Sequence, residues 1–131
     1  MHKKHLFTTL FLSWVVLITS LSLFSFSGFD NAIGIGMPHM DKITHFVFHL
    51  GFVVLGYLFM KERAKGLFNE QQALLKIVIA AIVYGLLIEA LQYMMPFGRV
   101  AEISDVLANV GGAIFGCLLI KKYFSLSEKL K

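Results

Sequence analysis

Four long apolar stretches in a chain of 131 residues set the strongest limit on what this sequence can fold into. They cover about residues 6–26, 43–60, 73–95 and 105–120 and carry few charges. A helix of about 20 apolar residues crosses the roughly 30 Å hydrocarbon core of a bilayer. Backbone groups in lipid must be hydrogen-bonded internally, so we expect helices rather than strands. The sequence therefore predicts an all-α membrane protein with four transmembrane helices in contact with the lipid bilayer.

The composition excludes most soluble classes of protein. Apolar residues make up 57% of the chain and charged residues 15%, whereas a typical soluble domain has about 25% charged residues. A chain this small cannot bury that much apolar surface in a core of its own. The single cysteine, Cys117, cannot form an internal disulfide. A soluble enzyme, a disordered tail and a disulfide-rich scaffold are excluded, and the length predicts one domain spanning residues 1–131.

The basic residues predict the orientation of the chain. With a cytoplasmic N-terminus, ten of the twelve Lys and Arg residues fall on the cytoplasmic side, and only Lys42 and Arg99 fall outside. Cytoplasmic loops are enriched in Lys and Arg, so we expect both termini in the cytoplasm. The connections at 61–72 and 96–104 are short, and short connections favour a compact antiparallel four-helix bundle.

The first apolar stretch has an alternative interpretation as a cleaved secretory signal. Basic residues precede it, and the small residues Ser25 and Ser27 loosely fit a cleavage site. The apolar region of a signal peptide has about 7–15 residues, and this apolar stretch is longer, which favours a retained helix.

Polar and ionisable residues gather in those halves of the stretches that are predicted to face outside. Asp41, His45 and His49 recur every four residues and share one helix face. Glu89 lies roughly 9 Å below the outer end of the third helix, at about 1.5 Å per residue. An ionisable residue at a helix centre costs about 2.5–3.5 kcal/mol on insertion scales and usually marks a function. The candidate residues of an outward-facing polar site are Asp41, Lys42, His45, Glu89, Gln92, Arg99, Asp105 and Asn109.

Simpler roles are open for several of these residues. Asp41 and Asp105 stand near predicted helix starts, where short polar side chains cap helices. Histidine and amide side chains form interhelical hydrogen bonds in membranes, and small residues such as Gly112 and Gly116 let helices pack closely. Glu89 is the hardest to explain in this way, because a carboxylate at that depth needs a partner or a proton.

The spacing of His45 and His49 raises the question of a metal site. Histidines four residues apart on a helix are a familiar pair of zinc ligands, and Glu89 or Asp41 would add an oxygen. The pattern lacks a third nitrogen or sulfur ligand, so the sequence predicts no metal and no cofactor. Nucleic acid is excluded as a partner, because the membrane topology accounts for the basic residues.

Many of these polar residues match, at the same spacing, the sequence pattern of one known family. The segments are DKITHFVFHLGFVVLGYL and YGLLIEALQYMMPFGRVAEISDVLANVGGAIFG, within residues 41–116. They resemble the VanZ-like family of small bacterial membrane proteins. His49 and the segment 28–40 lie outside the family pattern. The matching positions are Asp41, Lys42, His45, Glu89, Gln92, Arg99, Asp105, Asn109 and Gly112.

The resemblance implies a protein of the bacterial cytoplasmic membrane that lowers susceptibility to glycopeptide antibiotics such as teicoplanin. Its outward-facing site would bind a lipid-linked cell-wall precursor or an envelope protein. Two other hypotheses stay open. In one, the protein is a membrane-embedded enzyme acting on such a precursor, with Glu89 and His45 in acid/base roles and Arg99 on a phosphate. In the other, the polar network only fixes the register of the helices.

Overall fold

Helices account for almost all of the chain that the computed structural model describes, which is residues 5–23, 40–94 and 103–129. No strand occurs in these ranges. Each helix is long and apolar enough to cross a membrane, as predicted. The helices are α1 (Leu6–Leu23), α3 (Met40–Arg63), α4 (Glu70–Met94) and α5 (Ile103–Lys129).

Three helices extend beyond the apolar stretches that predicted them. α3 begins three residues before residue 43 and ends three residues after residue 60, and α4 begins at Glu70 rather than at 73. α5 continues to Lys129 rather than ending at 120. Lys, Arg and Glu are good helix formers, so a helix does not stop where its apolar residues stop. The predicted last residues of the first and third helices, 26 and 95, lie outside the described residues.

The connection between α3 and α4 is built from residues that end one helix and begin the next. Gly66 has a φ of +103°, a backbone conformation that favours glycine. The Oδ1 of Asn69 accepts a hydrogen bond of 3.1 Å from the backbone N–H of Gln72. Asn69 is therefore the N-cap of α4, one of the residue types that satisfy the free N–H groups of a first turn.

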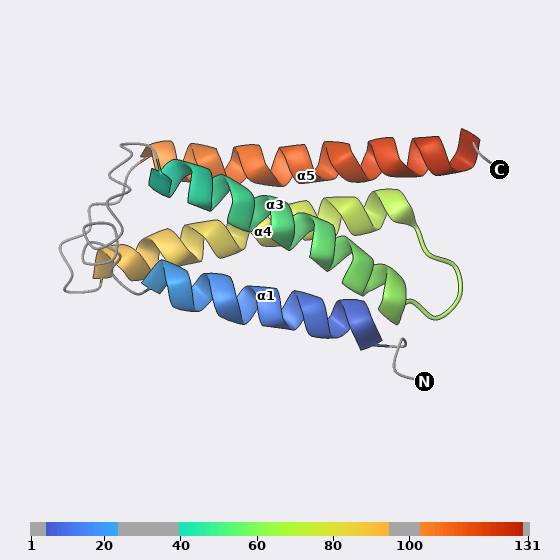
Figure 1. Ribbon diagram of the computed structural model, residues 1–131, viewed down its shortest axis with the longest axis horizontal. Coiled ribbons are helices and arrows are strands. Elements are labelled where there is room, and N and C mark those ends of the chain that lie inside the picture. The colour runs from blue at the N-terminus through green and yellow to red at the C-terminus, as the bar shows by residue number, and fades with distance from the viewer. Residues whose placement is uncertain (1–4, 24–39, 95–102, 130–131) are drawn as a thin grey trace.

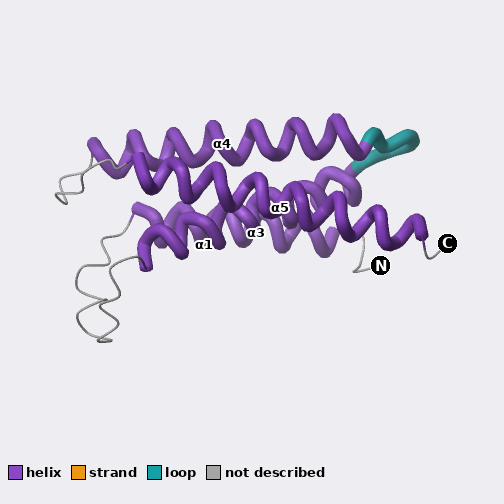
Figure 2. Tube along the Cα trace, turned by 90° about the horizontal axis from the view of Figure 1, so that it is seen from above, coloured by secondary structure: helices purple, strands orange, loops and turns teal. Residues whose placement is uncertain are grey.

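α3 is the central helix of the bundle and packs against all three of the others (Figure 1). α4 also contacts α1 and α5. Both views place the α3–α4 connection at the same end of the bundle as the start of α1 and the end of α5 (Figures 1 and 2). We call this the loop end, defined by residues 64–69. The start of α3, the end of α4 and the start of α5 lie at the opposite end.

The apolar core lies along the faces that the helices turn toward α3. Val53 and Tyr57 of α3 and Ile18 of α1 are fully buried, and Ile77 of α4 and Ile120 of α5 pack in the same cluster. Many Leu, Ile and Val side chains on the outward faces of the helices are exposed. This distribution suits a bundle whose outer surface is covered by lipid.

Glycines bring the backbones of α3 and α5 into contact. A Cβ added at Gly112 would collide with the backbone carbonyl of Phe46, and one added at Gly116 would lie 3.1 Å from the carbonyl oxygen of Leu50. Small residues permit this kind of close helix packing in membranes. The α3–α5 contact fixes which face of α5 is turned toward α3.

Candidate functional site

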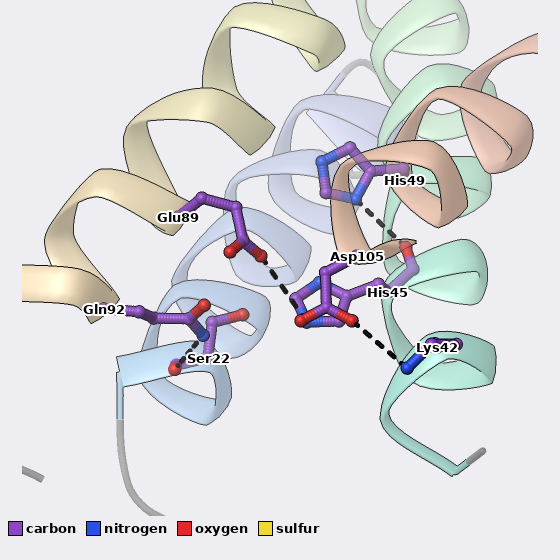
Figure 3. A network of polar contacts seen from close by, with 7 residues as sticks. All are labelled: Ser22, Lys42, His45, His49, Glu89, Gln92 and Asp105. Atoms are coloured by element: carbon purple, nitrogen blue, oxygen red, sulfur yellow. Dashed lines mark hydrogen bonds and ion pairs between the residues drawn. The ribbon is translucent and has the colours of Figure 1, made fainter. Parts of the chain in front are cut away.

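Three helices place ionisable side chains at one level near the end opposite the loop end. His45 comes from α3, Glu89 from α4 and Asp105 from α5. Their exposed fractions are 7%, 6% and 8%. Figure 3 shows the three side chains turned toward one another. We call these three residues the buried cluster.

The imidazole of His45 lies between the two carboxylates of the buried cluster. Its Nε2 is 3.9 Å from Oε1 of Glu89 and 4.0 Å from Oδ2 of Asp105. Charge-assisted N–H···O hydrogen bonds are about 2.7–2.9 Å long, so these contacts are ion-pair distances rather than hydrogen bonds. Lys42, one turn before His45, places its Nζ 4.0 Å from Oδ1 of Asp105, on the side of the cluster toward the start of α3 (Figure 3).

The register of α5 explains why Asp105 meets α3. Asp105, Asn109, Gly112 and Gly116 follow one another at intervals of three and four residues, so they share a helix face. Because Gly112 and Gly116 press this face against the backbone of α3, Asp105 is held two turns away on the same side. Asp105 lies in the first turn of α5, where a negative side chain also favours the helix N-terminus.

A second layer of polar groups lies one helical turn deeper than the buried cluster. The Nδ1 of His49 is 3.1 Å from the backbone carbonyl of His45. A carbonyl only accepts hydrogen bonds, so Nδ1 donates and Nε2 of the neutral ring is an acceptor. A Cβ at Gly85 of α4 would lie 2.7 Å from this Nε2 and 3.0 Å from Nδ2 of Asn109. Glycine at position 85 therefore leaves the space that these two side chains occupy.

Two buried side chains of the second layer have polar atoms without a hydrogen-bond partner in the part of the chain that the structure describes. His49 is 3% exposed and Asn109 is 2% exposed. Neither Nε2 of His49 nor the amide oxygen and nitrogen of Asn109 has a partner among the described residues. Buried polar atoms are nearly always hydrogen-bonded to protein or ordered water, so this layer has hydrogen-bonding capacity that the described residues do not use.

α1 reaches the same level through a backbone contact. The Nε2 of Gln92 donates a hydrogen bond of 2.6 Å to the carbonyl oxygen of Ser22 (Figure 3). Gln92 thus connects α4 to α1 and does not use this nitrogen on Glu89. Ser22 was not among the predicted residues, since a backbone carbonyl leaves no signal in the sequence.

The structure brings together half of the eight predicted site residues. Lys42, His45, Glu89 and Asp105 are linked by three contacts of 3.9–4.0 Å, from Lys42 to Asp105 and from His45 to each carboxylate. Gln92 faces α1, and Asn109 lies one turn deeper. The side chain of Asp41 and all of Arg99 lie outside the described residues. The two histidines that the sequence places on one face of α3 have different surroundings, because His49 lies against Gly85 while His45 faces the carboxylates.

The sequence of the chain matches the model of a known protein family. The family model for VanZ/LLP1 matches residues 3–125. The match covers α1, α3 and α4 completely and α5 up to residue 125, so the buried cluster lies within it. No curated protein and no solved structure gives a significant match to the chain.

Proposed function

The chain belongs to the VanZ/LLP1 family, and on that basis we propose that this multi-pass membrane protein lowers the susceptibility of the bacterial envelope to glycopeptide antibiotics such as teicoplanin. In this proposal the buried cluster, together with Lys42, Gln92, Asn109, Asp41 and Arg99, forms the site that binds an envelope ligand. The observation that carries the proposal is the convergence of ionisable side chains from three helices on one level. Ionisable residues in such places usually mark a function.

The proposal includes an orientation in the cytoplasmic membrane, with both termini in the cytoplasm. Lys61 and Arg63 end α3 at the loop end, Lys65 follows in the connection, and Lys121 and Lys122 lie in the last part of α5. Positive residues favour the cytoplasmic side. The end of the bundle that carries the buried cluster then faces outside, where lipid-linked cell-wall precursors and glycopeptide drugs are present.

Lys42 supports an anionic headgroup as the ligand. Its side chain is 31% exposed, while its Nζ lies 4.0 Å from the carboxylate of Asp105. A lysine at the rim of a site can act as a point charge for a phosphate. We therefore propose the phosphate-bearing headgroup of a lipid-linked precursor as the ligand, with Arg99 as a second cation. An envelope protein is the alternative partner.

A membrane-embedded enzyme is the second candidate, and the position of His45 favours it. An imidazole between two carboxylates is a group that can exchange protons with either of them and with a substrate. In this mechanism Glu89 and His45 share the acid/base role on a lipid-linked precursor. Binding and catalysis differ in their response to substitution: removal of a catalytic carboxylate abolishes function, whereas a binding site loses function in steps, with the largest loss at Arg99.

Antibiotic susceptibility tests the proposed function directly. A glycopeptide-sensitive host would express the parent chain, Glu89→Gln or Glu70→Gln at matched membrane levels. Glu70→Gln is the matched control, because it makes the same change on the same helix roughly 28 Å from Glu89, at about 1.5 Å per residue. We expect the parent and Glu70→Gln to raise the inhibitory concentration of teicoplanin, and Glu89→Gln to lose that effect.

Each outcome has a distinct meaning. If the parent chain leaves teicoplanin and vancomycin susceptibility unchanged, the resistance role is refuted. If Glu89→Gln protects as well as the parent, the role of the buried cluster is refuted while the resistance role stands. If Glu89→Gln is lost from the membrane, the carboxylate is needed for folding, and Asp105→Asn at matched levels repeats the test.

A further inference from the structure

We propose that His45, Glu89 and Asp105 form a binding site for one divalent metal ion of the zinc type. The inference deepens the proposed function, because it rests on the same buried cluster being a site. It does not depend on antibiotic resistance, since metal binding is measured on the purified chain.

The donor atoms of the buried cluster suit such an ion. Zinc binds histidine nitrogen at about 2.0–2.1 Å and carboxylate oxygen at about 2.0–2.2 Å, and zinc sites that act on a substrate have three protein ligands and a water. One imidazole and two carboxylates supply three ligands. The ligand set differs from the histidine pair considered in the sequence: Asp105 joins His45 and Glu89, and His49 lies against Gly85 one turn away.

The distances within the cluster fit atoms that surround a common point. One ligand atom from each of the three residues lies within 4.8 Å of the other two. The Nε2 of His45 is nearly equidistant from the two carboxylates, at 3.9 and 4.0 Å. A shared proton would draw one carboxylate to about 2.7–2.9 Å. A point central to the three atoms is roughly 2.3–2.8 Å from each, so zinc bonds require them to close in by about half an ångström.

The electrostatics of the cluster favour a cation at this point. Glu89 and Asp105 are 6% and 8% exposed, and a buried carboxylate is stable only with compensating positive charge or a proton. Lys42 approaches from the outer side of Asp105. A divalent ion between the carboxylates would compensate both at once.

The second polar layer is an independent observation that points the same way. Nε2 of His49 and the amide of Asn109 are buried one turn below His45 and Asp105, with no partner among the described residues. Water bound by an ion in the layer above would satisfy buried polar groups of this kind. Both layers are built from the same three helices, at positions four residues apart.

Metal analysis of the full chain tests the proposal. The protein would be purified in detergent without a polyhistidine tag, loaded with Zn²⁺, freed of excess metal and analysed by mass spectrometry of the metal. We expect one zinc per chain. Competition with a chromogenic chelator should show binding at least about tenfold weaker in Glu89→Gln and in Asp105→Asn, as for loss of a ligand or its support. Glu70→Gln and His5→Gln are controls that should bind as the parent does.

X-ray absorption of the zinc-loaded parent chain gives a second test that needs no variant. One imidazole with oxygen ligands is expected. Absence of stoichiometric zinc overturns the proposal, and so do equal binding by the parent and both cluster variants, several imidazoles, or sulfur from Cys117. Zinc binding without antibiotic resistance refutes only the proposed function, and resistance in a chain that binds no zinc refutes only the metal site.

Discussion

Gly112 offers a sharp test of the packing that places Asp105 beside His45. In Gly112→Ala the new methyl group would meet the backbone carbonyl of Phe46, which cannot rotate away as a side chain can. To make room for it, α3 and α5 would have to move apart by about 1 Å or more, which would disrupt their close packing. Gly111→Ala is the matched control, because its Cβ would lie 3.7 Å from the ring of Phe46, an ordinary contact.

The expected magnitude follows from two opposing effects. Overpacking a close contact costs about 1–3 kcal/mol, and a rigid backbone obstacle favours the upper part of that range. Replacing a helical glycine by alanine returns up to about 1 kcal/mol through helix propensity. We expect Gly112→Ala to lower the free energy of unfolding by about 2 kcal/mol, and Gly111→Ala to leave it unchanged or raise it by up to about 1 kcal/mol.

Unfolding by SDS in mixed micelles measures this difference. Trp14 is the single tryptophan, and its Nε1 donates a 3.0 Å hydrogen bond to the carbonyl of Phe48 on α3, so its fluorescence reports the packing of the central helix. Equal stability of the Gly112→Ala variant and the parent would refute the reasoning. So would a loss in Gly111→Ala as large as that in Gly112→Ala.

Two further predictions concern the start of α1 and the orientation of the chain. The Glu62 carboxylate accepts hydrogen bonds from the backbone N–H groups of Phe7 and Thr8, at 2.7 and 3.2 Å. Glu62→Gln removes the negative charge that favours a helix N-terminus, so hydrogen exchange at these amides should quicken; unchanged exchange would contradict this role. In a Cys-free background, Asn31→Cys should react with an impermeant thiol reagent in intact cells and Asn69→Cys should not, and the reverse labelling would overturn the proposed orientation.

The sequence predicts the four helices well, because long apolar runs with few charges can form little else than membrane-spanning helices in a chain this short. It predicts their ends less well. α5 passes Ile120 and reaches Lys129, since helix propensity continues into the charged residues after the apolar ones. Apolar runs indicate where a helix crosses lipid, and they leave open how far it extends beyond.

The faces of the candidate site were predictable, and the contacts between faces were not. Intervals of three and four residues place His45, Glu89 and Asp105 each on a polar face of its helix. Which of these faces meet depends on how whole helices pack against one another. The spacing of residues along one helix carries no information about that packing. Gln92 illustrates this, because it could have paired with Glu89 but donates to a backbone carbonyl of Ser22.

The order of the helices along the chain has a consequence for how the protein is made. The buried cluster takes one residue from each of α3, α4 and α5, and these helices leave the ribosome one after another. His45 and Glu89 therefore precede Asp105 in the order in which the chain is synthesised and emerges. Each polar residue inserted alone is unfavourable by a few kcal/mol, up to about 3.5 kcal/mol on insertion scales. α5 thus completes the cluster, and a chain that ends before α5 lacks both the carboxylate of Asp105 and the close glycine contact with α3.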